Sequence, residues 1–255
     1  MESIGLITVT ADPDAIFQIL FTSPTMDSCR ILDLGAIKKS LHEVQAQFES
    51  LNAQLDEQRD PFDNIVCDNM LQGYALIDRL ITEGVDLFDL RQVDWMIEIN
   101  TTVLCGVDPG RRKEFARHIA MTSSRFFDND EGGIRDLLEW YDLHRHESVW
   151  KRAAGIFVRI LSKPQLFIEG NHRSGSLIVS FLLMREGLPP FVLSTNNTVA
   201  FFNPASVIRR MPKNGFSALF QLPKIKKKYA DFLEEQSSPK FLLRKLRRAA
   251  KNGIH

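Results

Sequence analysis

The sequence predicts a mainly α-helical protein, and three observations lead to this fold class. Apolar residues recur at alternating spacings of three and four along most of the 255 residues, which places them on one face of a helix. No segment repeats at a fixed period, so a repeat architecture is not expected. With 44% hydrophobic and 25% charged residues, the composition is that of a soluble globular protein, and no stretch approaches the roughly 20 apolar residues of a membrane span.

The first predicted element is a long amphipathic helix in an N-terminal region spanning 1–59. Its apolar stripe consists of Leu34, Ile37, Leu41, Val44, Phe48, Leu51 and Leu55. Pro61 ends the pattern, because proline cannot continue a helix. A stripe of this length suits one face packed against a domain core, which is the commoner case, or a coiled-coil seam.

The next helices belong to a core domain that we expect to span 60–219. The apolar pattern predicts one helix over 64–83, ended by Gly84, and another over 89–105. After a turn, the pattern restarts at 108–115.

Two more helices are predicted over 134–148 and 149–163, and Pro164 ends the second of them. The following helical run, 177–187, is apolar on nearly all sides. We therefore expect that helix to lie in the middle of the fold.

One segment, 123–133, interrupts the helical pattern with the sequence SSRFFDNDEGG. Its start is short and aromatic, and its polar second half has the composition of a turn or an exposed loop. The sequence therefore predicts a short β-hairpin near 123–133.

The stretch 164–176, PQLFIEGNHRSGS, has the pattern of an anion-binding loop that leads into a helix. A helix that begins at Gly170 offers unpaired N–H groups and the positive end of its dipole to an anion. Arg173 adds a planar guanidinium that suits phosphate oxygens, and Glu169 is a hard carboxylate placed to hold Mg²⁺ between two phosphates. A Walker-type loop is disfavoured, because that loop needs Gly-Lys-[Ser/Thr] after a strand.

The order x-x-F-x-E-G-N-x-R-[ST] in this loop resembles the signature of the Fic (filamentation induced by cAMP) family, H-x-F-x-[DE]-G-N-G-R-x-x-R. Downstream, REGLPPFVLSTNNTVAFFNPASVI resembles the family's helix end, its Pro-Pro turn and the aromatic pair of its next helix. The resemblance covers roughly residues 60–210. It implies a Fic-like helical bundle in which the hairpin near 123–133 is the flap that positions the target.

The resemblance also implies a ligand, a metal and a set of site residues. The ligand is a nucleotide such as ATP, Mg²⁺ accompanies it, and a nucleotidyl (AMP-type) or other phosphate-containing group is transferred to a protein target. Phe167 anchors the loop in the core. By position in the motif, Glu169 would hold the metal and Gln165 and His172 would take part in catalysis. The nucleotide would be bound by Gly170, Asn171, Arg173 and Ser174.

Two positions depart from the family signature. Gln165 stands where the family has the histidine that acts as a base on a target hydroxyl, and Ser176 replaces the second arginine. Glutamine cannot take a proton near neutrality, so a transferase would need another group to act as the base or a target that needs none. His172 could contact a phosphate, be a displaced base or be a solvent-facing residue at the helix start, and a target carboxylate would need no base. His144 and His146 are spaced i, i+2 and make a poor metal pair.

These departures leave two functions open. The leading one is a Fic-like enzyme that transfers a nucleotidyl or other phosphate-containing group to a protein without the usual histidine. The other is a catalytically silent Fic-like domain that binds or regulates. Both would bind a nucleotide or related phosphate ligand through Glu169, Asn171 and Arg173.

The C-terminal segment 220–255 is expected to form a basic tail. It holds ten basic and three acidic residues, so it carries a net charge of +7 and the rest of the chain carries −7. Its stretch 240–253, KFLLRKLRRAAKNG, suits a short amphipathic helix that packs by one face. The alternative is contact with nucleic acid or an anionic membrane.

Two further features predict a cytoplasmic protein. The three cysteines, Cys29, Cys67 and Cys105, are odd in number and widely spaced, which favours reduced thiols over a disulfide framework. The N-terminal sequence has early acidic residues and no basic n-region, so no signal peptide is expected.

Overall fold

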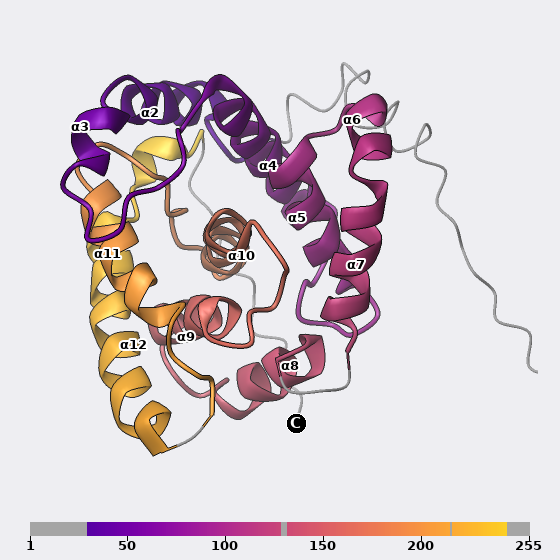
Figure 1. Cartoon of the computed structure of the whole chain (residues 1–255), viewed down its shortest axis with the longest axis vertical. Coiled ribbons are helices and arrows are strands. Elements are labelled where there is room, and N and C mark those ends of the chain that lie inside the picture. The colour runs from indigo at the N-terminus through magenta and orange to yellow at the C-terminus, as the bar shows by residue number, and fades with distance from the viewer. Residues whose placement is uncertain (1–29, 129–131, 215, 244–255) are drawn as a thin grey trace, which may run out of the picture.

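A computed structural model describes residues 30–128, 132–214 and 216–243, and for 216–219 it describes only the backbone. The α10 helix (Asn171–Arg185) runs through the middle of the molecule, and the other helices surround it (Figure 1). Across these residues the mainly helical class is confirmed, and no strand forms.

The long amphipathic helix predicted over 34–55 is divided into α2 (Leu34–Ala46) and α3 (Phe48–Asn52). Asp33 caps α2 by accepting a hydrogen bond from the N–H of Ala36. The predicted stripe faces the core: Ile37, Leu41, Val44, Phe48, Leu51 and Leu55 each expose 9% or less of their surface. Packing against the domain core, rather than a coiled-coil seam, therefore explains the stripe.

The loop that follows α3, residues 53–63, is fastened at both of its ends. The Asn52 side chain accepts a hydrogen bond from the N–H of Arg59 at 2.8 Å and donates to the Arg59 carbonyl at 3.1 Å. At its far end, Asp63 caps α4 (Asn64–Thr82) by accepting from the N–H of Val66. The bond between Asn52 and Arg59 explains why the helix ends well before Pro61.

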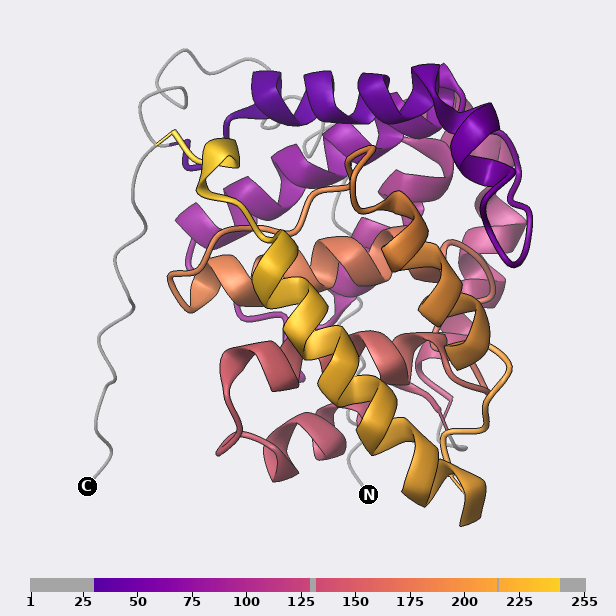
Figure 2. The same ribbon diagram turned by 90° about the vertical axis from the view of Figure 1, so that its left-hand side faces the viewer.

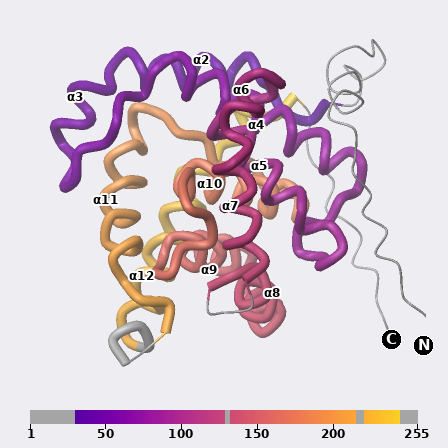
Figure 3. The backbone as a smooth tube through the Cα atoms, turned by 45° about the vertical axis from the view of Figure 1, so that its right-hand side comes forward, coloured from indigo at the N-terminus to yellow at the C-terminus, as the bar shows by residue number. Residues whose placement is uncertain are grey.

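The α4 helix and α5 (Asp94–Cys105) pack against each other and against one side of α10. A short helix, α6 (Pro109–Glu114), and then α7 (Ala116–Phe126) continue the chain along the outside of α5. Figure 3, turned so that α6 and α7 come forward, shows this outer layer beside α10. The helices predicted over 64–83 and 89–105 are thus confirmed, although the second begins five residues later.

The β-hairpin predicted near 123–133 is not present in the described residues. The α7 helix continues through Phe126, so 123–126 are helical and the strand expected there is wrong. The reason is burial: the ring of Phe126 is fully buried and stacks on Phe167 at a centroid distance of 5.7 Å. Residues 129–131 lie outside the described part of the chain.

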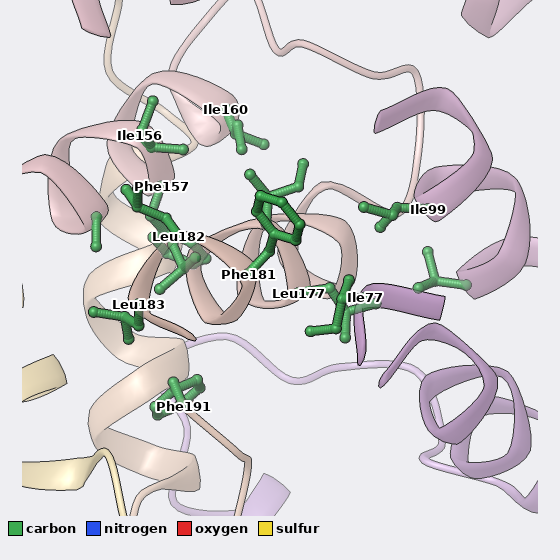
Figure 4. Packing of buried hydrophobic residues seen from close by; sticks show 14 of the residues in the cluster. Ile77, Ile99, Ile156, Phe157, Ile160, Leu177, Phe181, Leu182, Leu183 and Phe191 are labelled. Atoms are coloured by element: carbon green, nitrogen blue, oxygen red, sulfur yellow. The ribbon is translucent and has the colours of Figure 1, made fainter. Parts of the chain in front are cut away.

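The centre of the core is formed by α10 and α9 (Val149–Leu161), with α8 (Ile134–Leu143) packed on α9. Figure 4 shows the α10 residues Leu177, Phe181, Leu182 and Leu183 among Ile77, Ile99, Ile156, Phe157, Ile160 and Phe191. These ten side chains are essentially inaccessible to solvent. The central position predicted for the helix over 177–187 is confirmed, and the helix itself begins six residues earlier.

The last layer consists of α11 (Thr198–Ile208) and α12 (Phe216–Gln236), which crosses α9 (Figure 2). Tyr229 of α12 stacks on Phe157 of α9 with ring centroids 4.6 Å apart. The expected boundary between core and tail at residue 219 therefore falls inside a helix that belongs to the core.

The two ends of the described chain meet beside α2. A short 3-10 helix, η2 (Pro239–Phe241), leads to an isolated antiparallel bridge between Leu32 and Leu242, and Asp33 N–H donates to the Phe241 carbonyl at 2.9 Å. The amphipathic helix suggested for 240–253 falls mostly on 244–255, which lie outside the described residues. Contact of that segment with nucleic acid or membrane stays a prediction. Among the described helices, none has the length and apolar character needed to cross a membrane.

Candidate functional site

The loop between α9 and α10 is held to the segment that follows α11. Lys163 N–H donates to the Met211 carbonyl at 2.8 Å, and Lys213 N–H donates to the Lys163 carbonyl at 2.8 Å. These bonds form a parallel bridge between Lys163 and Pro212. The start of the candidate loop and the end of α11 are therefore fixed relative to each other.

The side chain of Asn171 shapes the turn of the loop. Its Oδ1 accepts from the N–H of Phe167 at 3.0 Å, and its Nδ2 donates to the Phe167 carbonyl at 2.8 Å. The Asn171 side chain is buried, and Phe167 is anchored in the core as predicted. Asn171 thus contributes to the site by holding the backbone.

Gly170 supplies the backbone conformation that starts α10. Its φ of 73° lies in the left-handed region, and a Cβ there would meet Nδ2 of Asn100 at 3.0 Å. The same Nδ2 donates to the Glu169 carbonyl and to Oγ of Ser174, both at 2.9 Å. Ser174 is completely buried, so its hydroxyl supports the loop from within.

The first turn of α10 has no side-chain cap, because its N-cap residue is Gly170. The first turns of α4 and α9 are capped by Asp63 and Ser148, whereas those of α5, α7, α8 and α11 also lack a side-chain cap. The N–H groups of the first turn lack intrahelical acceptors and carry the positive end of the helix dipole. This turn can therefore donate hydrogen bonds to an anion.

Arg173 lies on this turn, and its guanidinium is oriented by the α5 backbone. One terminal nitrogen donates to the Val103 carbonyl at 2.7 Å. Burial lowers the pKa of Arg173, and the charges of Glu169 and Asp63 oppose that shift. Within the described residues, Arg173 forms no ion pair shorter than 4.0 Å. Its remaining N–H groups can bind a phosphate.

His172 is enclosed rather than solvent-facing. Its Nε2 is buried and has no hydrogen-bond partner among the described residues. Burial and then the positive charges of Arg59, Arg209 and Arg173 together lower the pKa of His172 to about 3. The imidazole is therefore neutral at physiological pH, and a base with this pKa is poorly matched to proton abstraction near neutrality.

Gln165 and Glu169 complete the set of predicted site residues. Gln165 is half-buried, and its Oε1 lies 3.5 Å from Nδ2 of Asn171, at the limit of a hydrogen bond. Glu169 is exposed, and no group of three or more His, Cys, Asp or Glu side chains in the described ranges is placed to hold a metal. A single exposed carboxylate still suits Mg²⁺, which takes one or two carboxylates together with ligand phosphates.

His144 and the two described cysteines, Cys67 and Cys105, contact other parts of the fold and are not part of the candidate site. Nδ1 of His144 is 2.7 Å from the Trp140 carbonyl, and its ring stacks on Trp140, so it does not form a metal pair with His146. Cys67 and Cys105 are free and buried, and burial raises the pKa of Cys67 to about 11. These two thiols are therefore unreactive, as expected of reduced core cysteines.

Sequence reasoning missed two groups of residues at this site. Asn100 supports the loop, and the signal for it was a single amide within the apolar run of α5. Arg59 and Arg209 act electrostatically on His172 from distant segments, and no local pattern marks them. No protein-family model, curated protein or solved structure matches the chain.

Proposed function

We propose that the chain binds a nucleotide or a related phosphate ligand at the first turn of α10 and acts as a binding or regulatory module. The observation that carries this proposal is the uncapped turn beside Arg173, whose guanidinium has no carboxylate partner within the described residues. Exposed Glu169 is available to hold Mg²⁺ against the ligand phosphates. The sequence resemblance to the Fic family supports the same ligand class.

The protonation chemistry of the loop favours binding over base-assisted transfer. Gln165 occupies the position of the expected base and cannot accept a proton near neutrality. His172 is the other candidate, and its pKa of about 3 leaves it neutral but a weak base. Neither side chain is suited to activate a hydroxyl on a target protein.

A second candidate function is nucleotidyl transfer to a carboxylate of a protein target. The position of Glu169 favours it, because a Mg²⁺ ion held there would neutralise charge on the phosphates. In that reaction a carboxylate oxygen of the target attacks the α-phosphorus, and pyrophosphate leaves with the bridging oxygen. A carboxylate is already ionised at neutral pH and needs no base.

A thermal-shift titration tests ligand binding. A ligand that binds only the folded state at about 100 times its Kd stabilises it by about 2.7 kcal/mol, which should raise the melting temperature by roughly 5–10 °C. We expect this shift with MgATP and its loss in Arg173→Ala. Arg145→Ala is the matched control, because that arginine is exposed and lies beyond the end of α8. A shift that persists in Arg173→Ala contradicts the proposed site.

Labelled nucleotide separates the two candidate functions. Saturable binding without label in protein supports the module, whereas covalent label supports the transferase. The double variant Gln165→His/Ser176→Arg restores the family's base and second arginine, and we expect it to gain weak self-labelling with ATP. Label that appears in the parent and disappears in the double variant would show that Gln165 belongs to a different chemistry.

A further inference from the structure

Three guanidinium groups from separate parts of the chain act on one buried imidazole. Arg173 is its neighbour on α10, Arg209 follows α11, and Arg59 comes from the 53–63 loop. Each positive charge lowers the pKa of His172. The uncapped turn of α10 therefore lies within a larger cationic region, and a single anion bound to Arg173 does not account for all of it.

Phe202 on α11 is a common neighbour of Arg59 and His172. The guanidinium carbon of Arg59 lies 5.4 Å from the centre of the Phe202 ring, and the His172 ring lies 6.0 Å from the same centre. A hydrogen bond from Arg59 to Ser206 Oγ holds the guanidinium in this position. Asn52 fixes the Arg59 backbone, as described above.

The charges in this region are only partly balanced by the protein. Glu57 forms ion pairs with Arg210 and, at 2.8 Å, with Arg209, but its nearest distance to Arg59 is 4.0 Å. The Arg59 side chain is 14% exposed, and burial followed by the charge of Arg209 lowers its pKa. Glu57 lies within 4.0 Å of all three arginines, and the charge of Asp60 also favours the charged form of Arg59. An added anion would further reduce the repulsion between Arg59 and Arg209.

The region around Arg59, His172 and Arg209 has hydrogen-bond donors without a partner, and it is accessible to solvent. Nε of Arg59 and Nε2 of His172 are buried without partners among the described residues. Nε is also unpartnered in Arg79, Arg152 and Arg159, and so is Nε2 of His118, so what distinguishes His172 is the set of guanidinium charges around its unpartnered nitrogen. A neutral imidazole with its proton on Nε2 donates one hydrogen bond. The Arg209 side chain is 44% exposed, so an anion can reach the region from outside.

We propose that Arg59, Arg209 and His172 bind a second anionic group of the ligand whose first group binds at the α10 turn. This inference rests on the proposed function and specifies its ligand class. Because His172 and Arg173 are consecutive residues of α10, one molecule with two anionic groups can reach both contacts. The preferred ligand is therefore a nucleoside diphosphate or triphosphate rather than a monophosphate.

Calorimetric titration of the full chain with MgADP and AMP tests the second contact. Arginine contacts to phosphate are charge-assisted, so we expect wild type to bind MgADP at least about tenfold more tightly than AMP. Arg59→Met keeps a long apolar stem on Phe202 and should abolish that advantage while leaving AMP affinity unchanged. Arg210→Met is the matched control, because it shares Glu57 but is not among the charges that lower the pKa of His172.

A direct readout at His172 keeps the inference testable apart from the proposed function. In protein with ¹⁵N-labelled histidine, the His172 ring signals are assigned by their loss in His172→Gln. Pyrophosphate should move these signals in wild type and in Arg173→Ala, but not in Arg59→Met. Arg59→Lys, which keeps the charge, serves if the methionine variant fails to fold.

The outcomes separate the two proposals. Ligand binding that needs Arg173 but retains its preference for MgADP in Arg59→Met overturns the inference and leaves the proposed function standing. A His172 response that needs Arg59, together with nucleotide binding that ignores Arg173, supports the second contact and overturns the proposed site. If neither pyrophosphate nor nucleotide binds wild type, both proposals are wrong.

Discussion

The two ends of α10 use arginine in opposite ways. At the C-terminal end, Arg185 pairs with Asp86 and donates to the Tyr141 hydroxyl at 2.8 Å. Arg152 donates to the same hydroxyl at 2.9 Å and forms an ion pair with Glu186 at 3.2 Å. At the N-terminal end, Arg173 donates only to a backbone carbonyl within the described residues.

The difference separates charges that stabilise the fold from charges that are available to a ligand. A buried guanidinium with carboxylate partners is costly to remove, because its partners are left uncompensated. A buried guanidinium without such partners contributes little to stability and keeps donors free. Function is commonly located where the structure forgoes local stability. The comparison thus places a candidate site at one end of α10 and a structural anchor at the other.

The largest expected effect concerns acid stability at the N-terminal end. The pKa of His172 is about 3 in the folded state and 6.5 ordinarily, so the unfolded state binds the proton more readily. This contribution is complete well above pH 6.5 and is lost as the pH falls toward 3. Wild type should lose about 3.3 kcal/mol more than His172→Gln between pH 7.5 and 4, measured by denaturant unfolding. His146→Gln, on an exposed histidine, should behave like wild type; equal curves for all three proteins would contradict an enclosed His172.

At the C-terminal end, removing one anchor should be nearly as costly. Arg152→Met leaves Glu186 and the buried Tyr141 hydroxyl without this donor. We expect the free energy of unfolding to fall by about 3 kcal/mol. Arg145→Met, on a largely exposed ion pair, should change it by less than about 0.5 kcal/mol. Similar losses in the two variants would remove the distinction between anchoring and surface arginines.

A glycine pair isolates the contact that supports the candidate loop. Gly170 and Gly84 share a φ of 73°, but a Cβ at Gly84 meets nothing within 4 Å, whereas one at Gly170 meets Asn100 at 3.0 Å and Leu104 at 3.2 Å. Gly84→Ala should cost about 1 kcal/mol and Gly170→Ala about 2 kcal/mol in denaturant unfolding. Equal costs would show that the Asn100 and Leu104 side chains move aside easily and do not constrain the turn.

The smallest expected effect on stability is at Arg173. Arg173→Met loses the bond to the Val103 carbonyl but also relieves a buried charge, so the free energy of unfolding should change by less than about 1 kcal/mol. The same variant should lose the thermal shift with MgATP. A loss of stability as large as that of Arg152→Met would show that the arginines at both ends of α10 stabilise the fold.

Local patterns were sufficient for the helices and for the position of the loop. The stripe that begins at Leu34 and the apolar run after Ser176 set which faces are buried, because burial follows the helical period. The hairpin failed for the converse reason. The aromatic pair at 126–127 is compatible with a strand when only the local sequence is considered. In the fold, Phe126 packs against Phe167, and the segment up to Phe126 is helical.

The electrostatics of the site could not be read from the sequence. Asn100 and Ser174 are 74 positions apart, and Arg59 and Ser206 are 147 apart, so only the assembled fold brings them together. The low pKa of His172 depends on burial and then on Arg59 and Arg209, which lie far from it in the sequence. The sequence alone left His172 open as a phosphate contact, a displaced base or a solvent-facing residue, and the burial of its Nε2 argues against the last of these.

The bridge between Leu32 and Leu242 joins segments that the ribosome makes far apart in time. Until residues 239–243 leave the exit tunnel, the edge beside Leu32 and Asp33 lacks its partner. Tyr229, which covers Phe157, also arrives late. We therefore expect the nascent chain to keep apolar surface exposed until residues 229–243 have been made. A chaperone that binds such surfaces has its opportunity on this protein in that interval.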